Sequence, residues 1–291
     1  MILTVTYNPA VDHTITVEEF PGPGDVARTD TDRFDAGGKG INVSKYLTGL
    51  GQETVATGLL GGFLAAFIER TLEGDGVRSD FVSIDGRTRL NTTILAEDER
   101  KINHSGPRVS AGVVDELIER IRAHEPDTVV LSGSLPPGLD HGALDRIAAA
   151  GDWRTAVDVD GPTLAVLQAE YALCKPNREE LAAATGRPVD TVEDCIDAAN
   201  ALVGAGFDRV VASLGADGAI LVTATEAVHV PARPVDVVDT VGAGDALLSG
   251  VLDALSAGSS DREALQHGVD VATAVVAVPG TEVPVFERLG D

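Results

Sequence analysis

The sequence predicts an α/β protein with a central, mostly parallel sheet flanked by helices and a small, separate β-sheet. Two observations lead to this prediction. From about residue 110, short strand-like segments alternate regularly with segments of helical apolar spacing. Before that point the chain is richer in strand-like segments. Because parallel strands need crossover connections, such alternation favours a parallel sheet between two helical layers.

The first hundred residues supply the segments of the small sheet. Strands are expected at 2–7, 14–18 and 92–96, with a polar turn at 97–100 and a returning strand at 101–103 that completes a hairpin. A helix is expected over 41–50. We expect one domain, 1–291, with a small β lid at about 13–35 and 86–104. The large α/β core would then be about 1–12, 36–85 and 105–291.

The remaining elements follow from apolar spacing. One helical face is formed by Val113, Val114, Leu117, Ile118 and Ile121. Further strands are expected at 128–132, 155–159, 209–213 and 219–223, and further helices near 141–150, 177–185 and 192–205. Ser260 and Glu263 form a capping-box pattern before a last apolar helix.

The composition excludes several classes of partner. The 46 acidic and 22 basic residues give a net charge of −24, which argues against nucleic acid or an anionic membrane as partner. Only four residues are lysines, and such an acidic, lysine-poor surface is typical of proteins of salt-rich cytoplasms. The chain has two cysteines without a CxxC pattern and no apolar run of the roughly 18 residues that a membrane span requires. We therefore expect a soluble, cytoplasmic protein.

The most informative motif is 239–245. The small residues Gly242, Ala243 and Gly244 leave the backbone bare where a helix begins, and such N–H groups bind anionic phosphate oxygens. Asp245 in the first helical turn is placed to take a proton from an attacking hydroxyl. The motif therefore indicates phosphoryl transfer to an alcohol. The alternative is a glycine-containing turn whose aspartate caps the helix.

A second glycine-rich segment, 37–42, precedes the helix expected at 41–50. Gly38 would let a ligand approach the backbone, Lys39 offers a charge for a phosphate, and Asn42 can bond to sugar hydroxyls. The spacing is not that of a P-loop, and a flexible turn with a solvated lysine is the alternative. Asp12 follows the first strand, where open α/β sheets place their ligands, and it could equally be an ordinary turn residue.

Other segments contain residues that could bind the phosphate that the substrate already carries, or ATP and its metal. Arg28 and Arg89 flank the expected lid, and arginine forks suit a phosphate that stays on the substrate, although a solvated role is the default. Ser134 lies in a rigid turn after the strand at 128–132. Asn177 and Glu180, three residues apart at a helix start, could hold the hydrated Mg²⁺ of ATP or could simply cap the helix. The segment 213–219 could contact nucleotide phosphates or form a hairpin turn.

Taken together, these motifs resemble the PfkB (ribokinase-like) family of carbohydrate kinases. Within this family they are similar to the branch of 1-phosphofructokinases and tagatose-6-phosphate kinases. The resemblance covers nearly the whole chain, in family order, through the segments 8–12, 37–42, 88–91, 132–138, 175–180, 213–218 and 239–245. It implies a ribokinase-like fold with a β-sheet lid, ATP as donor and Mg²⁺ as its metal. An exposed lid edge could also pair two subunits.

The resemblance also implies residue roles. Asp245 would be the base, with the backbone of Gly242, Ala243 and Gly244 as the anion hole. The sugar would be held by Asp12, Gly38, Lys39 and Asn42, and its phosphate by Arg28, Arg89 and Ser134. ATP and its metal would face Lys175, Asn177, Glu180, Ser213, Gly215 and Gly218. Two departures from the family pattern are Ala246, where serine is frequent, and the segment 157–161.

The expected substrate is fructose 1-phosphate, because three cations, Arg28, Lys39 and Arg89, gather in a chain that is otherwise so acidic. Tagatose 6-phosphate and fructose 6-phosphate are alternatives within the family. A ligand-sensing homologue without catalysis is the alternative outside enzymes. A dinucleotide-dependent oxidoreductase is disfavoured because no GxGxxG follows the first strand.

Overall fold

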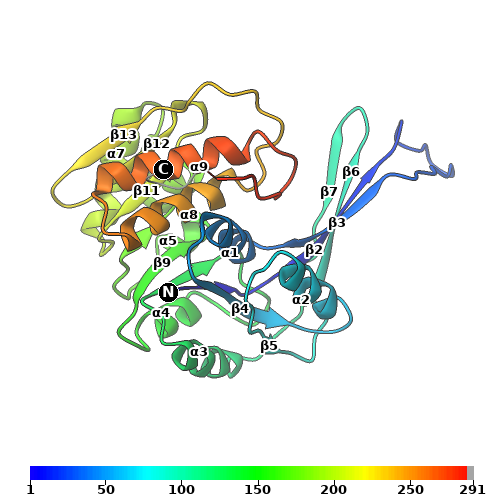
Figure 1. Cartoon of the computed structure of the whole chain (residues 1–291), viewed down its shortest axis with the longest axis horizontal. Coiled ribbons are helices and arrows are strands. Elements are labelled where there is room, and N and C mark those ends of the chain that lie inside the picture. The colour runs from blue at the N-terminus through cyan, green and yellow to red at the C-terminus, as the bar shows by residue number, and fades with distance from the viewer. Residues whose placement is uncertain (287–291) are drawn as a thin grey trace.

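A large sheet forms the centre of the molecule in the computed structural model, which describes residues 1–286. Its strands within that range are β1 (Ile2–Thr6), β4 (Thr54–Leu60), β5 (Val82–Ser83), β8 (Thr128–Ser132), β9 (Arg154–Asp158), β10 (Leu173–Cys174), β11 (Val210–Ser213), β12 (Ala219–Val222) and β13 (Ala227–Val230). Their order is β13-β12-β11-β10-β9-β8-β1-β4-β5 (Figure 1). Only β12 pairs antiparallel, with both of its neighbours, so the predicted mostly parallel sheet is confirmed.

Helices cover both faces of this sheet, as predicted. They are α1 (Lys39–Leu50), α2 (Ala65–Gly74), α3 (Val113–His124), α4 (Gly142–Ala148), α5 (Gly161–Leu164), α6 (Arg178–Thr185), α7 (Val192–Gly204), α8 (Ala243–Ser256), α9 (Asp261–Val275) and the 3₁₀ turn η1 (Gly215–Asp217). Along β8, Val129 and Leu131 join the core under α3 to α7, whereas Val130 joins the core under α1, α8 and α9. This alternation follows from the two-residue period of a strand.

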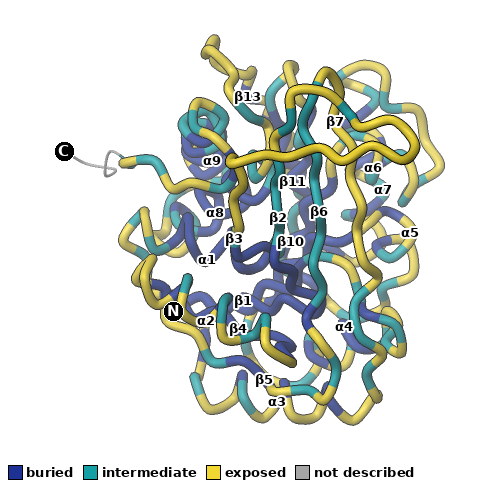
Figure 2. Tube along the Cα trace, turned by 90° about the vertical axis from the view of Figure 1, so that its right-hand side faces the viewer, coloured by how far each residue is buried: buried dark blue, intermediate teal, exposed yellow. Residues whose placement is uncertain are grey.

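A small, separate sheet projects from one side of the main body (Figures 1 and 2). Its strands are β2 (Ala10–Thr16), β3 (Asp32–Gly37), β6 (Arg89–Leu95) and β7 (Glu99–Ile102), in the order β3-β2-β6-β7. Its base is anchored because Val11 and Ala36 pack against α1 and α2. Its far ends are exposed, and every residue of the edge strand β7 is exposed (Figure 2).

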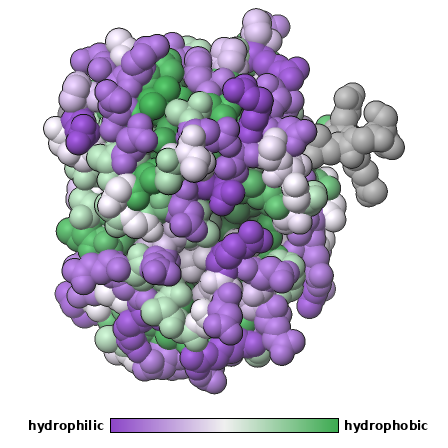
Figure 3. Space-filling view, turned by 90° about the vertical axis from the view of Figure 1, so that its left-hand side faces the viewer, coloured by the Kyte–Doolittle hydropathy of each residue, from purple (hydrophilic) through white to green (hydrophobic). Residues whose placement is uncertain are grey.

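The outer surface is largely hydrophilic on the face shown in Figure 3, where apolar side chains form small, separate areas. Across the described residues, no helix combines the length and the apolar character that crossing a bilayer would require.

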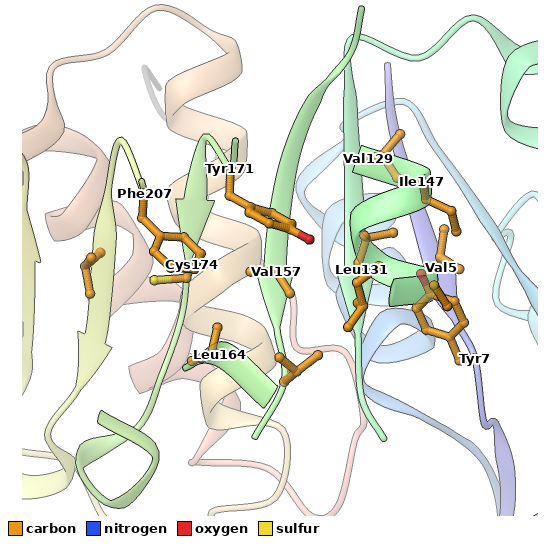
Figure 4. Close-up of a cluster of buried hydrophobic side chains, with 14 of the residues drawn as sticks. Val5, Tyr7, Val129, Leu131, Ile147, Val157, Leu164, Tyr171, Cys174 and Phe207 are labelled. Carbon is orange, nitrogen blue, oxygen red and sulfur yellow. The ribbon is translucent and has the colours of Figure 1, made fainter. Parts of the chain in front are cut away.

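The larger core cluster lies between the sheet and the helices α3 to α7 (Figure 4). Tyr171 and Phe207 stack with ring centroids 5.5 Å apart, beside the buried thiol Cys174. The Tyr171 hydroxyl donates a hydrogen bond to Asp145 at 2.9 Å, which satisfies the polar end of a buried ring. The capping box predicted from Ser260 and Glu263 is also present, at the start of α9.

Candidate active site

The first turn of α8 is a cradle of free backbone N–H groups. Gly242 precedes the helix with a φ of 80°, a left-handed conformation that favours glycine. Among the described residues, the N–H groups of Gly242, Gly244 and Asp245 have no hydrogen-bond partner, whereas that of Ala243 donates to the Thr240 carbonyl at 3.3 Å. Free N–H groups at a helix N-terminus attract anions, so this cradle can bind a phosphoryl group.

Asp245 lies beside this cradle and is almost completely buried. The Asn42 side-chain amide donates a hydrogen bond to its Oδ2 at 2.8 Å. Burial, reinforced by the negative charge of Asp158, raises the pKa of Asp245 to about 6, although Asn42, Lys175 and Lys39 act in the opposite direction. A carboxylate with such a pKa is ionised at neutral pH and is a stronger base than a solvated aspartate.

Two lysines flank the carboxylate and share one buried partner, Asp158, at the end of β9. The ammonium groups of Lys39 and Lys175 lie 2.8 Å and 3.4 Å from the two Asp158 oxygens, and Lys39 lies 3.5 Å from Glu180. Burial alone would lower the pKa of Lys39, but the attraction of Asp158 and Glu180 outweighs it and raises that pKa. No role was predicted for Asp158, although its position at the carboxyl end of a parallel strand is typical of ligand-binding residues.

We expect Asp158→Asn to shift the acid limb of the kcat/KM profile to lower pH by roughly one unit. Asp158 raises the pKa of Asp245, and its removal leaves the positive charges of Lys39 and Lys175 without their shared anion. The sugar phosphate titrates identically with both enzymes, so the difference between the two profiles reports on the protein. Asp80→Asn, at a surface ion-pair cluster with His124, is the control. An unmoved acid limb in Asp158→Asn would contradict this electrostatic coupling.

The side of the site that is predicted to hold the sugar is formed by Asp12 and the glycines that open α1. The Asn91 side chain donates a hydrogen bond to Asp12 Oδ1 at 2.8 Å, and burial raises the pKa of Asp12. A methyl group at Gly37 would lie 1.9 Å from Asp12 Oδ2, and one at Gly38 would lie 2.6 Å from Thr6. Glycine at both positions therefore leaves room for the Asp12 carboxylate and for the start of α1.

Of the residues predicted to hold the substrate phosphate, two lie together and one lies apart. Arg89 donates from Nε to the Asn8 carbonyl at 3.0 Å and from Nη1 to the His104 carbonyl at 3.3 Å. The Asn8 side chain in turn donates to Ser134 Oγ at 3.3 Å. Arg28 lies in the exposed loop between β2 and β3 and has no ion pair or hydrogen bond with any described residue.

The predicted metal residues form a capping box. Asn177 Oδ1 accepts the Glu180 N–H, and Glu180 Oε2 accepts the Asn177 N–H, both at 2.8 Å. Glu180 Oε1 remains available and faces Lys39. Within the described range there is no cluster of three or more metal-ligating side chains. Both side chains therefore cap α6, and Glu180 Oε1 is the carboxylate oxygen that the capping box does not use.

The predicted nucleotide segment joins two antiparallel strands, β11 and β12. The Ser213 N–H donates to the Pro176 carbonyl, which places this segment beside the start of α6. Gly215 has a φ of 62° and open space around it. Gly218 has a structural reason to be glycine, because a methyl group there would lie 2.1 Å from the Val230 carbonyl. Gly215 is therefore the member of this turn with room for a ligand.

A cradle of free N–H groups with a buried carboxylate beside it is the arrangement expected of an enzyme that transfers a phosphoryl group to a hydroxyl group. The profile described as pfkB family carbohydrate kinase matches residues 5–287. The chain therefore belongs to this family, whose members transfer a phosphoryl group to a sugar hydroxyl.

The chain is similar to several named proteins over nearly its full length. It is 56% identical to a protein of Haloferax volcanii named 1-phosphofructokinase, covering 99% of this chain and 94% of that protein. It is 36% identical to the D-tagatose-1-phosphate kinase of Bacillus licheniformis, covering 92% and 90%. The structure of phosphofructokinase-2 from Escherichia coli in complex with fructose-6-phosphate superimposes with a TM-score of 0.86 at 28% identity, covering 94% and 93%.

Proposed function

We propose that this protein is a 1-phosphofructokinase, which transfers the terminal phosphoryl group of ATP to the 6-hydroxyl of fructose 1-phosphate in the cytoplasm. The observation that carries the proposal is the buried Asp245 carboxylate, held by Asn42 beside the free N–H groups of Gly242 and Gly244. The products are fructose 1,6-bisphosphate and ADP.

The choice of sugar is supported by two relatives. The 1-phosphofructokinase of Haloferax volcanii and the D-tagatose-1-phosphate kinase of Bacillus licheniformis both have names that place the existing phosphate on C1. With that phosphate near Arg89 and Ser134, Asp12, Gly38, Lys39 and Asn42 would contact the sugar. Arg28 would join the phosphate only after its loop closes over the site.

In the proposed reaction, Asp245 orients the 6-hydroxyl and takes its proton as the oxygen attacks the phosphorus in line. The N–H groups of Gly242 and Gly244 stabilise the charge on the phosphoryl oxygens, and the ammonium group of Lys175 lies next to Gly244. Bound Mg²⁺ would neutralise the ATP phosphates, and Glu180 and Asn177 would hold its waters. Ser213 and Gly215 would contact the nucleotide.

We also assign a lid role to the small sheet. Its base is packed against α1 and α2, whereas its far end is exposed, so it can close over the sugar and exclude water. The exposed edge strand β7 has free backbone groups with which a second subunit could pair, and we propose a homodimer through this lid.

A comparison of three sugar phosphates as substrates tests the proposed function. ADP release would be measured with fructose 1-phosphate, tagatose 6-phosphate and fructose 6-phosphate, at low and at molar salt because of the charge of −24. We expect kcat/KM for fructose 1-phosphate to exceed the others by at least about tenfold. ATP without sugar is the control. A preference for another sugar would overturn the substrate assignment, and no ADP release with any sugar would favour a ligand-sensing protein.

A further inference from the structure

A cavity of about 470 Å³ opens beside Arg89, between the start of β6 and the segment 103–107 that follows β7. Its lining includes Arg87, Arg89 and His104 and contains no acidic residue. A lining with two arginines and no acidic residue contrasts with the chain as a whole, which has 46 acidic and 22 basic residues. The cavity is therefore a local region of positive potential on a negatively charged protein.

Both arginines line this cavity. Thr88, which separates them, is buried and accepts a hydrogen bond from the Gly61 N–H at 3.0 Å through its side chain. Arg87 and Arg89, on either side of Thr88 in the sequence, thus belong to a segment whose middle residue is held in place by this hydrogen bond.

Neither arginine forms an ion pair with a described residue, although the negative charge of Asp12 acts on Arg89 from a longer distance. Arg89 donates to two backbone carbonyls, those of Asn8 and His104, and neither acceptor is a carboxylate. Arg87 has no hydrogen bond or ion pair with any described residue, and its stem packs against Gly62. Most other arginines with a partner in this chain face a carboxylate, for example Arg209 with Asp261 at 2.7 Å. Arg87 is therefore available for an external anion.

Hydrogen bonds through Asn8 connect the cavity to the candidate active site. The Asn8 side chain donates both to the Ser105 carbonyl at 3.0 Å and to Ser134 Oγ at 3.3 Å. A methyl group at Gly106 would lie 2.1 Å from Asn8 Oδ1, so glycine permits this close approach. The loop that carries His104 is thus fixed beside the turn that carries Ser134.

We propose that Arg87 and His104 complete the binding site for the phosphate that the sugar already carries. This proposal rests on the proposed function and adds two residues to Arg89 and Ser134. Two arginine forks match the two charges of a phosphate monoester and can bind it through paired hydrogen bonds. The site would therefore select sugars by their phosphate, and the unphosphorylated sugar would gain nothing from Arg87.

The test compares Arg87→Gln with Arg70→Gln, a matched control at an exposed arginine of α2 that also lacks an ion pair with any described residue. Fructose 1-phosphate binding would be measured calorimetrically without ATP, so that catalysis is not required. We expect Arg87→Gln to weaken binding by about tenfold or more and His104→Gln by a smaller factor, with Arg70→Gln unchanged. The KM for ATP should change less than about twofold.

Equal binding by Arg87→Gln and wild type would overturn the proposal, as would an equal rise in the KM values of sugar phosphate and ATP. Failure of the proposed function is distinguishable, because it appears as absence of ADP release from the wild-type enzyme. In that case inorganic phosphate serves as the probe. Its binding must still weaken in Arg87→Gln but not in Arg70→Gln, and otherwise the cavity is not a phosphate site.

Discussion

Replacing Asp245 by alanine is expected to reduce turnover by at least about 10²-fold while affinity for fructose 1-phosphate stays close to that of the wild type. The carboxylate is buried beside the cradle and accepts a hydrogen bond from Asn42, and the role proposed for it is proton transfer rather than binding. Turnover would be measured by ADP release and affinity by calorimetry. Wild-type turnover in this variant would refute the assignment of the base.

Asp245→Asn is a control that preserves the shape of the side chain. Its effect on stability is a further prediction. Because burial raises the pKa of Asp245 from 3.8 to about 6, the ionised carboxylate destabilises the fold above that pH. We expect Asp245→Asn to be inactive yet more stable at pH 7.5, by up to about 3 kcal/mol. The gain should shrink as the pH falls towards 4, where the wild-type carboxyl is protonated. Urea unfolding at two pH values measures both effects.

Gly242→Ala is expected to lower kcat by at least about tenfold, because the cradle cannot keep its shape with a larger residue. A methyl group at this position would lie 2.3 Å from the hydroxyl of Tyr46, which is buried and has no hydrogen-bond partner within the described residues. The φ of 80° adds backbone strain of roughly 1–2 kcal/mol. The collision and the strain both act on the N–H groups that would hold the phosphoryl group.

Two further variants separate the collision from the strain. In Gly242→Ala with Tyr46→Phe, the nearest ring atom would be 3.4 Å from the new methyl group, so part of the activity should return. Gly258→Ala has a similar φ of 84° and no atom within 4 Å, so it should lose stability without losing turnover. Wild-type activity in Gly242→Ala would show that this backbone is not a preorganised anion site.

Much of the fold could be predicted because the spacing of apolar residues along a strand or helix is a local property of the sequence. The expected strand at 128–132 coincides with β8, and the one at 155–159 lies one residue from β9. The strand β4 was not predicted individually, because every one of its residues is buried and it therefore lacks alternation. The two-residue strand β10 owes its position to its neighbours β9 and β11.

The site was less predictable because its contacts join distant parts of the chain. Asn42 and Asp245 are 203 residues apart, and no local pattern shows that one donates a hydrogen bond to the other. Asp158 ends an ordinary apolar strand, and no local pattern shows that Lys39 and Lys175 both lie beside it. Arg28 was predicted to hold the substrate phosphate only because it is an arginine. Its position depends on a long loop between β2 and β3, and the residue pattern does not determine the course of that loop.

The most direct test is a crystal structure with fructose 1-phosphate and a non-hydrolysable ATP analogue. We predict that the sugar O6 lies about 2.6–3.2 Å from the Asp245 carboxylate, with the C1 phosphate at Arg89 and the terminal ATP phosphate against the N–H groups of Gly242 and Gly244. A carboxylate that points away from the cradle, or a sugar bound without any hydroxyl near it, would contradict base-assisted phosphoryl transfer at this site.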